Sequence, residues 1–181
     1  MAEKALIVDL SRSFGGANVR TLTLLAHLEP GTAALACVAG SPVDREATRL
    51  GLPRHTLARH KFDPRLPWRL LTLARQHGYK VLDAQNIQSR LWACLTTLAK
   101  DVALVSTFNS WTGWEHQGRP KGKIYGSLDQ LAIARSDMCI AVSEDVRQHL
   151  IRQGAAAERV VFVANGVNID HTTVPDRRAA L

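Results

Sequence analysis

Short apolar runs without polar alternation recur along this chain, and segments with helical spacing separate them. Such runs are typical of strands that are covered on both faces, as in parallel sheets. The repeated alternation of strand and helix predicts a Rossmann-like α/β fold, with a mostly parallel sheet of about seven strands and helices on both faces. The predicted strands are 4–10, 33–39, 55–58, 80–84, 101–107, 137–142 and 159–163.

Capping residues mark several helix boundaries. Ser41 before Pro42 predicts one helix start, and Ser143 before two acidic residues predicts another. Gly78 predicts the end of a helix that begins near residue 66. One further helix is predicted from apolar residues with helical spacing, at Ile87, Leu91, Leu95 and Leu98.

A glycine turn, 11–18, joins the first predicted strand to the first predicted helix. Strand, glycine turn and helix in this order can form a phosphate site, because a helix N-terminus has unpaired N–H groups and partial positive charge. The turn lacks both the G-x-G-x-x-G dinucleotide motif and a P-loop ending. From this stretch alone, a phosphate cradle and a bare strand-to-helix turn remain equal alternatives.

Length and composition indicate one ordinary globular domain, with 181 residues of which 46% are hydrophobic. The chain has no apolar run long enough for a membrane span and no secretory signal pattern at its start. Cys37, Cys94 and Cys139 each lie in an apolar run without metal-binding spacing, so we expect buried free thiols in a reducing, cytoplasmic compartment. We expect no metal and no cofactor.

The loops after the strands are where ligands bind in sheets of this kind. Here they contain Gly15, Gly16, Gln85, Asn86, Asn109, Trp111, Ser143 and Asn165. The long segment 108–123 also holds Trp114 and His116, the one histidine in a candidate active loop. Its tryptophans suit contact with sugar rings or apolar lipid chains, or simple packing of the loop onto the domain, and both interpretations stay open. Asp83 and Glu115 are carboxylates near these loops, and neither receives a role.

Several stretches together resemble the family-four retaining glycosyltransferases, which have the two-domain GT-B fold. Gly15-Gly16-Ala17-Asn18 followed by Arg20 resembles the family's first loop. Segments 124–131 and 134–143 resemble its helix, Arg-x-Asp, strand and Ser stretch. The segment 158–168 resembles its closing Glu-Arg, strand and Asn-Gly-Val-Asp signature. The resemblance covers most of residues 4–170.

The resemblance implies that residues 1–170 are the N-terminal, acceptor-side domain and that 171–181 begin the inter-domain linker. The C-terminal donor-binding domain would be absent, and the isolated domain would be inactive. The implied activity is transfer of a sugar from a nucleotide-sugar to a hydroxyl acceptor with retention. The alternative is a non-catalytic Rossmann-like module that binds a sugar or nucleotide.

The resemblance also implies roles for individual residues. Gly15 and Gly16 would approach the donor diphosphate. The acceptor and cleft residues would be Asn18, Gln85, Asn86, Asn109, Trp111, Trp114, His116, Ser143, Asn165 and Gly166. Gln85 and Asn109 stand where the family often has histidines, and amides cannot act as acids or bases near neutral pH. No catalytic residue is firmly assigned, and Asn109 is the candidate.

The implied partners are the missing C-terminal domain, a nucleotide-sugar and a carbohydrate or lipid-linked acceptor. The net charge of +7 carries no nucleic-acid motif with it, so we expect no nucleic-acid partner. The basic stretch 54–69, with Phe62 and Trp68 among its charges, is either a solvated face or a peripheral contact with the anionic inner face of the membrane. The solvated face is favoured, because no strong apolar stripe accompanies these charges.

Overall fold

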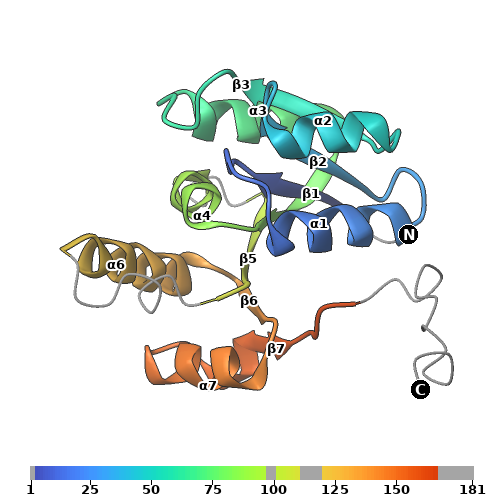
Figure 1. The fold of residues 1–181 in the computed structure, drawn as a ribbon. Coiled ribbons are helices and arrows are strands. Elements are labelled where there is room, and N and C mark those ends of the chain that lie inside the picture. Colours follow the sequence, from blue (N-terminus) through green and yellow to red (C-terminus); the bar gives the residue numbers. More distant parts are fainter. Residues whose placement is uncertain (1–2, 97–100, 111–119, 167–181) are drawn as a thin grey trace, which may run out of the picture.

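The computed structural model describes residues 3–96, 101–110 and 120–166, and of residues 120–123 the backbone alone. Seven parallel strands form one sheet in the order β3-β2-β1-β4-β5-β6-β7 (Figure 1). The predicted Rossmann-like fold is therefore confirmed. The strands are β1 (Lys4–Asp9), β2 (Ala33–Val38), β3 (Arg54–Ala58), β4 (Tyr79–Ala84), β5 (Ala103–Phe108), β6 (Met138–Ala141) and β7 (Val160–Phe162).

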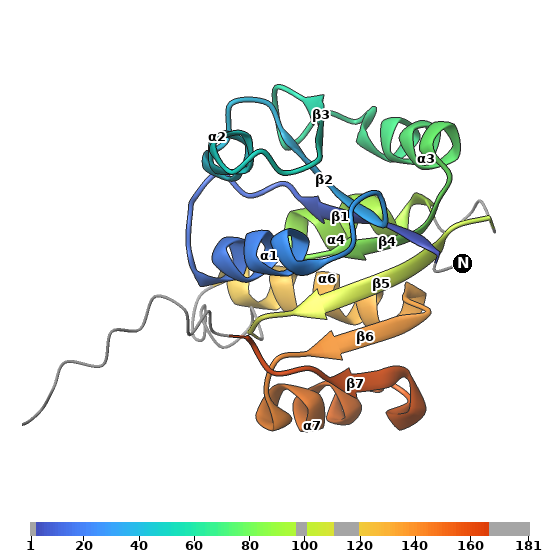
Figure 2. The ribbon, with the colours of Figure 1, turned by 90° about the vertical axis from the view of Figure 1, so that its right-hand side faces the viewer.

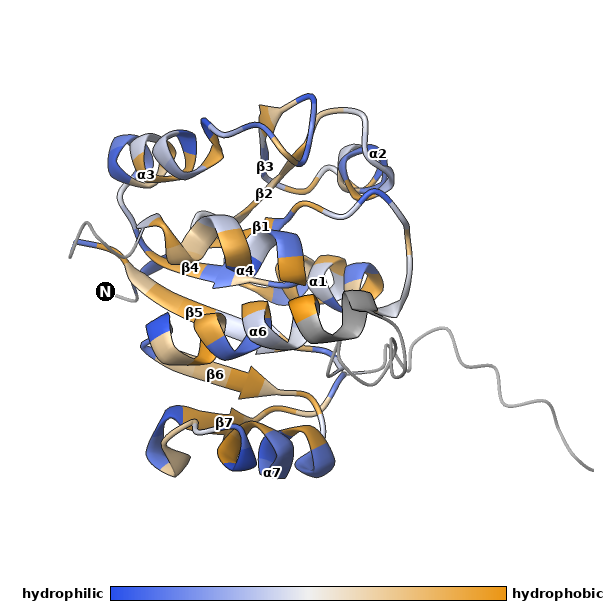
Figure 3. Cartoon of the chain, turned by 90° about the vertical axis from the view of Figure 1, so that its left-hand side faces the viewer, coloured by the Kyte–Doolittle hydropathy of each residue, from blue (hydrophilic) through white to orange (hydrophobic). Residues whose placement is uncertain are grey.

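The described helices divide between the two faces of the sheet. They are α1 (Gly16–His27), α2 (Pro42–Arg49), α3 (Leu66–His77), α4 (Ile87–Cys94), α6 (Pro120–Arg135), α7 (Glu144–Arg152) and the short η2 (Ala157–Arg159). Helices α1 and α2 cover β1 and β2 on one face (Figure 2). Helices α3, α4 and α6 lie on the opposite face, and α7 packs at the β6–β7 end (Figure 3). Both faces are thus covered, as the continuous apolar strands require.

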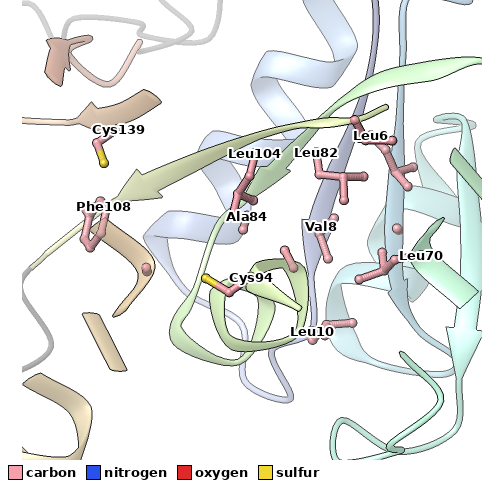
Figure 4. Packing of buried hydrophobic residues seen from close by; sticks show 14 of the residues in the cluster. Leu6, Val8, Leu10, Leu70, Leu82, Ala84, Cys94, Leu104, Phe108 and Cys139 are labelled. Carbon is pink, nitrogen blue, oxygen red and sulfur yellow. The ribbon is translucent and has the colours of Figure 1, made fainter. Parts of the chain in front are cut away.

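The larger core cluster forms on the face of α3 and α4. Leu6, Val8 and Leu10 on β1 and the loop after it are fully buried there. Figure 4 shows these side chains beside those of β4 and β5, with Leu70 of α3 and Cys94 of α4 facing them. The other face of β1 contributes Ile7 to a smaller cluster with α1 and α2. Because side chains alternate along a strand, β1 supplies both cores at once.

Local capping chemistry explains several helix boundaries. The Ser41 hydroxyl accepts a hydrogen bond from the Asp44 N–H at 3.3 Å, and the Ser143 hydroxyl accepts one from the Val146 N–H at 3.2 Å. Each satisfies one N–H group that the first helical turn leaves unpaired. Gly78 follows α3 with φ of 72°, a left-handed conformation that glycine adopts at little cost. These predicted caps are confirmed.

Helix α4 buries a different face from the one that its leucine spacing suggests. Leu95 is 45% exposed, Ile87 and Leu91 are half-buried, and Leu98 lies outside the described residues. The buried positions are instead Ser89, Arg90, Ala93 and Cys94. The helix was predicted correctly, but the leucine spacing does not identify its core face. Polar partners decide which face is buried, since Arg90 pairs with Asp129 of α6.

The three cysteines are free and buried, as predicted. Burial is the main cause that raises the pKa of the Cys37 thiol to about 12 and of the Cys94 and Cys139 thiols to about 11. Such thiols carry almost no thiolate near neutral pH and are inert in the folded chain. Among the described helices, none has the length and apolar character needed to cross a membrane.

Candidate functional site

A polar pocket of about 430 Å³ lies at the carboxyl edge of the sheet. Its walls come from the loops after β1, β4 and β5 and from the first turns of α1 and α4. Six residues expected at the site from the sequence line it together: Gly15, Gly16, Asn18, Gln85, Asn86 and Asn109. They come together because parallel strands end at one edge, which is where ligands bind in open α/β sheets.

Asp9 fixes the two loops that form most of this pocket. Its buried carboxylate accepts hydrogen bonds from the Ser11 N–H at 2.9 Å, from Asn18 Nδ2 at 2.7 Å and from Asn86 Nδ2 at 2.8 Å. Asn18 belongs to α1, and Asn86 caps α4. One carboxylate at the end of the interior strand β1 therefore sets the positions of both helix starts.

Asn18 and Asn86 use their amide atoms to build the loops. The Asn18 Oδ1 accepts from the Gly15 N–H at 2.8 Å, and its Nδ2 donates to Asp9 and to Ser11 Oγ. The Asn86 Oδ1 accepts from the N–H and the hydroxyl of Ser89, each at 3.0 Å. Both side chains line the pocket, but most of their hydrogen bonds go to the protein itself, and both Nδ2 hydrogens of Asn18 are used in this way.

The glycines at the start of α1 are not required by the protein's own packing. Gly15 has φ of −164°, an extended conformation open to any residue, and neither Gly15 nor Gly16 has a positive φ. A Cβ built on either glycine would meet no atom within 4 Å among the described residues. The N–H groups of Gly16 and Ala17 have no acceptor in the described part of the chain, and the first turn has no acidic residue. This helix start is open to an anion.

Gln85 connects a buried carboxyl to an arginine. Its Nε2 donates to Asp83 Oδ2 at 2.7 Å, and its Oε1 accepts from Arg20 Nη1 at 3.3 Å. The Thr107 hydroxyl donates to Asp83 Oδ1 at 2.7 Å. Burial raises the pKa of Asp83 to about 6, and hydrogen bonds from Thr107 and Gln85 and the charge of Arg20 oppose that rise. Asp83 therefore changes its charge close to physiological pH.

Two buried polar atoms in residues that line the pocket lack partners among the residues that the structure describes. Asn109 donates its Nδ2 to the Gln85 carbonyl at 3.1 Å, but its Oδ1 accepts nothing. Arg90 binds the Thr107 carbonyl and Asp129 and stacks over Phe108, yet its Nε is unpaired. Because a buried unpaired acceptor or donor is costly, each of these two atoms would gain from a polar partner.

The remaining predicted site residues lie elsewhere. Ser143 caps α7, Asn165 is exposed, and Gly166 lines a separate groove of about 280 Å³ between α1 and the segment after β7. Trp111, Trp114 and His116 fall outside the described residues. The structure therefore brings only some of the expected cleft residues together in one pocket.

Sequence reasoning did not identify Asp9, Arg20 and Arg90 as members of the site. Asp9 had one usable signal, because it is a charged residue at the end of an otherwise apolar strand. Arg90 lies within a leucine-rich helix, where its burial depends on Asp129 in a distant segment. In the described parts of the chain, no group of three or more His, Cys, Asp or Glu side chains is arranged to hold a metal ion.

Comparison with known proteins gives a family and a fold. A sequence profile described as Glycosyltransferase Family 4 matches residues 14–171. No curated protein has a significant sequence match. The Anabaena protein Alr3699/HepE, solved in complex with UDP-glucose, superposes with a TM-score of 0.75 at 19% identity, covering 92% of this chain and 45% of its own.

Two other solved structures share the fold. The lipopolysaccharide outer core galactosyltransferase WaaB superposes with a TM-score of 0.63 at 13% identity, over 92% of this chain and 46% of WaaB. A UDP-GlcNAc 2-epimerase from Neisseria meningitidis, bound to UDP-GlcNAc, gives 0.64 at 10% identity, over 90% of this chain and 46% of the epimerase. The chain thus spans less than half the length of these proteins, and the fold alone does not separate transferases from epimerases.

Proposed function

Since this chain belongs to glycosyltransferase family 4, we propose that it forms the acceptor-side half of a retaining sugar transferase. The intact protein moves a hexosyl group from a nucleotide-sugar to a hydroxyl of a carbohydrate or lipid-linked acceptor. A second domain supplies most contacts to the nucleotide. No metal ion or cofactor takes part in this proposal, and the role in carbohydrate biosynthesis belongs to it as well.

The open start of α1 is the observation that carries this proposal. Gly15 and Gly16 have no need to be glycine for the chain's own sake, yet they line the polar pocket beside unpaired N–H groups. A diphosphate that approaches these N–H groups would gain from the helix dipole. Because the diphosphate is also the leaving group, the same contacts stabilise the charge that develops as the glycosidic bond breaks.

The pocket beyond the glycines suits an acceptor hydroxyl. The Asn109 Oδ1 can accept a hydrogen bond from the hydroxyl, and the Arg90 Nε–H can donate one to a hydroxyl oxygen. These groups orient the acceptor but do not remove its proton. An amide at position 109 is neutral at every relevant pH, so a group other than Asn109 takes the proton.

Titration of UDP into the intact protein tests the diphosphate site. Gly16→Val should weaken UDP binding at least tenfold, because its side chain projects into the space that the ligand uses. Gly126→Val is the matched control: the built Cβ also meets no atom within 4 Å, and Gly126 lies in α6, away from the pocket. Equal affinity in wild type and Gly16→Val would remove the phosphate role from this loop.

Measuring sugar transfer tests whether catalysis requires both domains. The intact protein should consume labelled nucleotide-sugar in the presence of acceptor, whereas the 181-residue chain alone should not. The anomeric configuration of the product, read by NMR, tests retention. Transfer by the isolated chain would contradict the proposal that it is only half of the site.

A non-catalytic binding module is the second candidate. Amides stand at positions 85 and 109, and both atoms of the Gln85 amide are engaged within the protein. Binding of UDP-sugar by the intact protein without any turnover across acceptors would favour this module.

We further propose that the intact protein is cytoplasmic, because the three thiols in this segment are free and buried.

A further inference from the structure

Two large aromatic side chains are exposed on one segment, 59–69. This segment comprises the β3–α3 loop and the start of α3 (Figure 1). Phe62 is 57% exposed and Trp68 is 69% exposed. Apolar rings are normally withdrawn from water, and exposure of two on one segment is a feature of interaction surfaces. We call this segment the aromatic–basic loop.

The aromatic–basic loop is fastened to the domain, so its rings are held outward. Trp92 of α4 donates its indole N–H to the Lys61 carbonyl at 2.8 Å. Arg69 Nη1 donates to the Leu57 carbonyl at 2.6 Å and pairs with Asp63 at 3.1 Å. Leu66, between the two exposed rings, is fully buried. The backbone is anchored on both sides of the rings.

Positive charge surrounds the two rings. The loop contains four Lys or Arg residues and a single acid, Asp63, which Arg69 neutralises. Arg59 and Arg65 are exposed and form no ion pair within the described part of the chain. The Lys61 ammonium lies 5.1 Å from the centre of the Phe62 ring. Exposed rings and exposed cations therefore alternate along one short segment.

This combination matches the chemistry of an anionic lipid surface. Tryptophan and phenylalanine insert at the boundary between head groups and acyl chains, while arginine and lysine stay among the anionic head groups. Single-stranded nucleic acid would need free ring faces for base stacking. The Lys61 ammonium lies over one face of the Phe62 ring, so that face is not free for base stacking.

We propose that the aromatic–basic loop is a docking surface for an anionic membrane. Helix α4 joins the loop to the polar pocket, because Trp92 contacts the loop and Arg90 lines the pocket. Docking would thus bring the pocket close to an acceptor held in the membrane. That consequence rests on the proposed function, whereas docking itself does not depend on it.

Vesicle sedimentation tests the docking surface. This chain should bind vesicles that contain about 30% phosphatidylserine and not vesicles of phosphatidylcholine alone, and about 0.5 M salt should release it. The double variant Phe62→Ser/Trp68→Ser should bind at least tenfold more weakly, and Arg59→Ser/Arg65→Ser should do the same. The matched control Phe14→Ser/Leu50→Ser removes two apolar residues that are 47% and 45% exposed near α1 and α2, and should bind normally.

Several results would overturn the proposal. They are equal binding by the aromatic double variant, equal loss in the control, and binding that ignores lipid charge. Complete competition by a single-stranded oligonucleotide would assign the loop to nucleic acid instead. Loss of a dimer in the aromatic variant, seen by analytical ultracentrifugation, would assign it to a second copy.

Vesicle binding and sugar transfer can be separated by experiment. Vesicle binding needs no turnover, so an intact protein that never transfers sugar but binds anionic vesicles through this loop would retain the docking proposal alone. Conversely, transfer to a water-soluble acceptor that persists in Phe62→Ser/Trp68→Ser, without vesicle binding by the wild type, would retain the proposed function alone.

Discussion

Single polar atoms decide what the pocket can recognise. Three amide side chains at the site form hydrogen bonds within the protein: those of Asn18, Asn86 and Gln85. The Asn109 Oδ1, by contrast, is buried without a partner among the described residues. A protein that keeps an unpaired buried acceptor carries a cost of order 1–3 kcal/mol, which a bound hydroxyl would relieve. At the residue scale, stability and function should therefore separate at position 109.

Asn109→Ala should lower kcat/KM of the intact protein about tenfold, the effect of one lost hydrogen bond to substrate. Its free energy of unfolding should change by less than about 1 kcal/mol, because the unpaired acceptor disappears together with one hydrogen bond. Asn86→Ala is the contrasting variant, since it removes a helix cap and should destabilise by about 1–2 kcal/mol. Urea unfolding and steady-state rates measure both. Normal kcat/KM in Asn109→Ala would exclude the hydroxyl contact.

Asp83 should make the folded state less stable as pH rises. Its pKa is about 6 in the folded chain, against an ordinary value of 3.8, so between these values the folded chain holds a proton that the unfolded chain has lost. The ionised carboxylate above pH 6 then costs the fold roughly 2–3 kcal/mol. Asp83→Asn cannot ionise. Its free energy of unfolding minus that of wild type should therefore increase from about pH 4 to about pH 7.

Taking the difference between the free energies of unfolding of Asp83→Asn and wild type removes the contribution of His55. Burial, and then the neighbouring His77, lower the pKa of His55, so its unfolded form binds more protons just below pH 6.5 and its stability contribution rises with pH. Both proteins contain this group, so it cancels in the difference. A difference that stays constant over the same pH range, measured by urea unfolding, would contradict the raised pKa of Asp83.

At the scale of whole helices, a buried ion pair joins α4 to α6. Arg90 Nη2 lies 2.6 Å from Asp129 Oδ1, with side-chain exposures of 3% and 0%. Arg90→Met should destabilise by about 3–5 kcal/mol because it leaves Asp129 charged and unpaired in the core. The double variant Arg90→Met/Asp129→Leu should recover at least half of that loss. A double-mutant cycle in urea measures the coupling, and additive losses would mean that the pair does not act as a unit.

The same two helices mark the limit of what could be predicted from the sequence. Strands, caps and the parallel sheet were predictable because their signals are local, as at Ser41, Gly78 and Ser143. The buried face of α4 was not, because Arg90 depends on a partner 39 residues away. The glycines and amides of the site could be predicted from their places after strands. The function of Asp9 could not, since it joins loops that are 77 residues apart.

The whole domain should unfold as one unit, because β1 contributes to both hydrophobic clusters. Cys37 lies in the cluster under α1 and α2, whereas Cys94 and Cys139 lie in the cluster on the opposite face. All three thiols should therefore react with a thiol reagent at one common rate that follows global unfolding. Mass spectrometry of the labelled peptides measures each rate. Faster labelling of Cys37 alone would indicate that the α1–α2 layer opens separately.

The strand order also has a consequence during synthesis on the ribosome. β1 pairs with β2 on one side and with β4 on the other, so its second edge stays unpaired until residues 79–84 have been made. At roughly 5–20 residues per second, the wait after β2 lasts a few seconds. During that time the nascent chain exposes an apolar strand edge, the kind of surface that other chains and chaperones bind. Helix α4 and its cap Asn86 appear only afterwards, so the ligand pocket is completed late in translation.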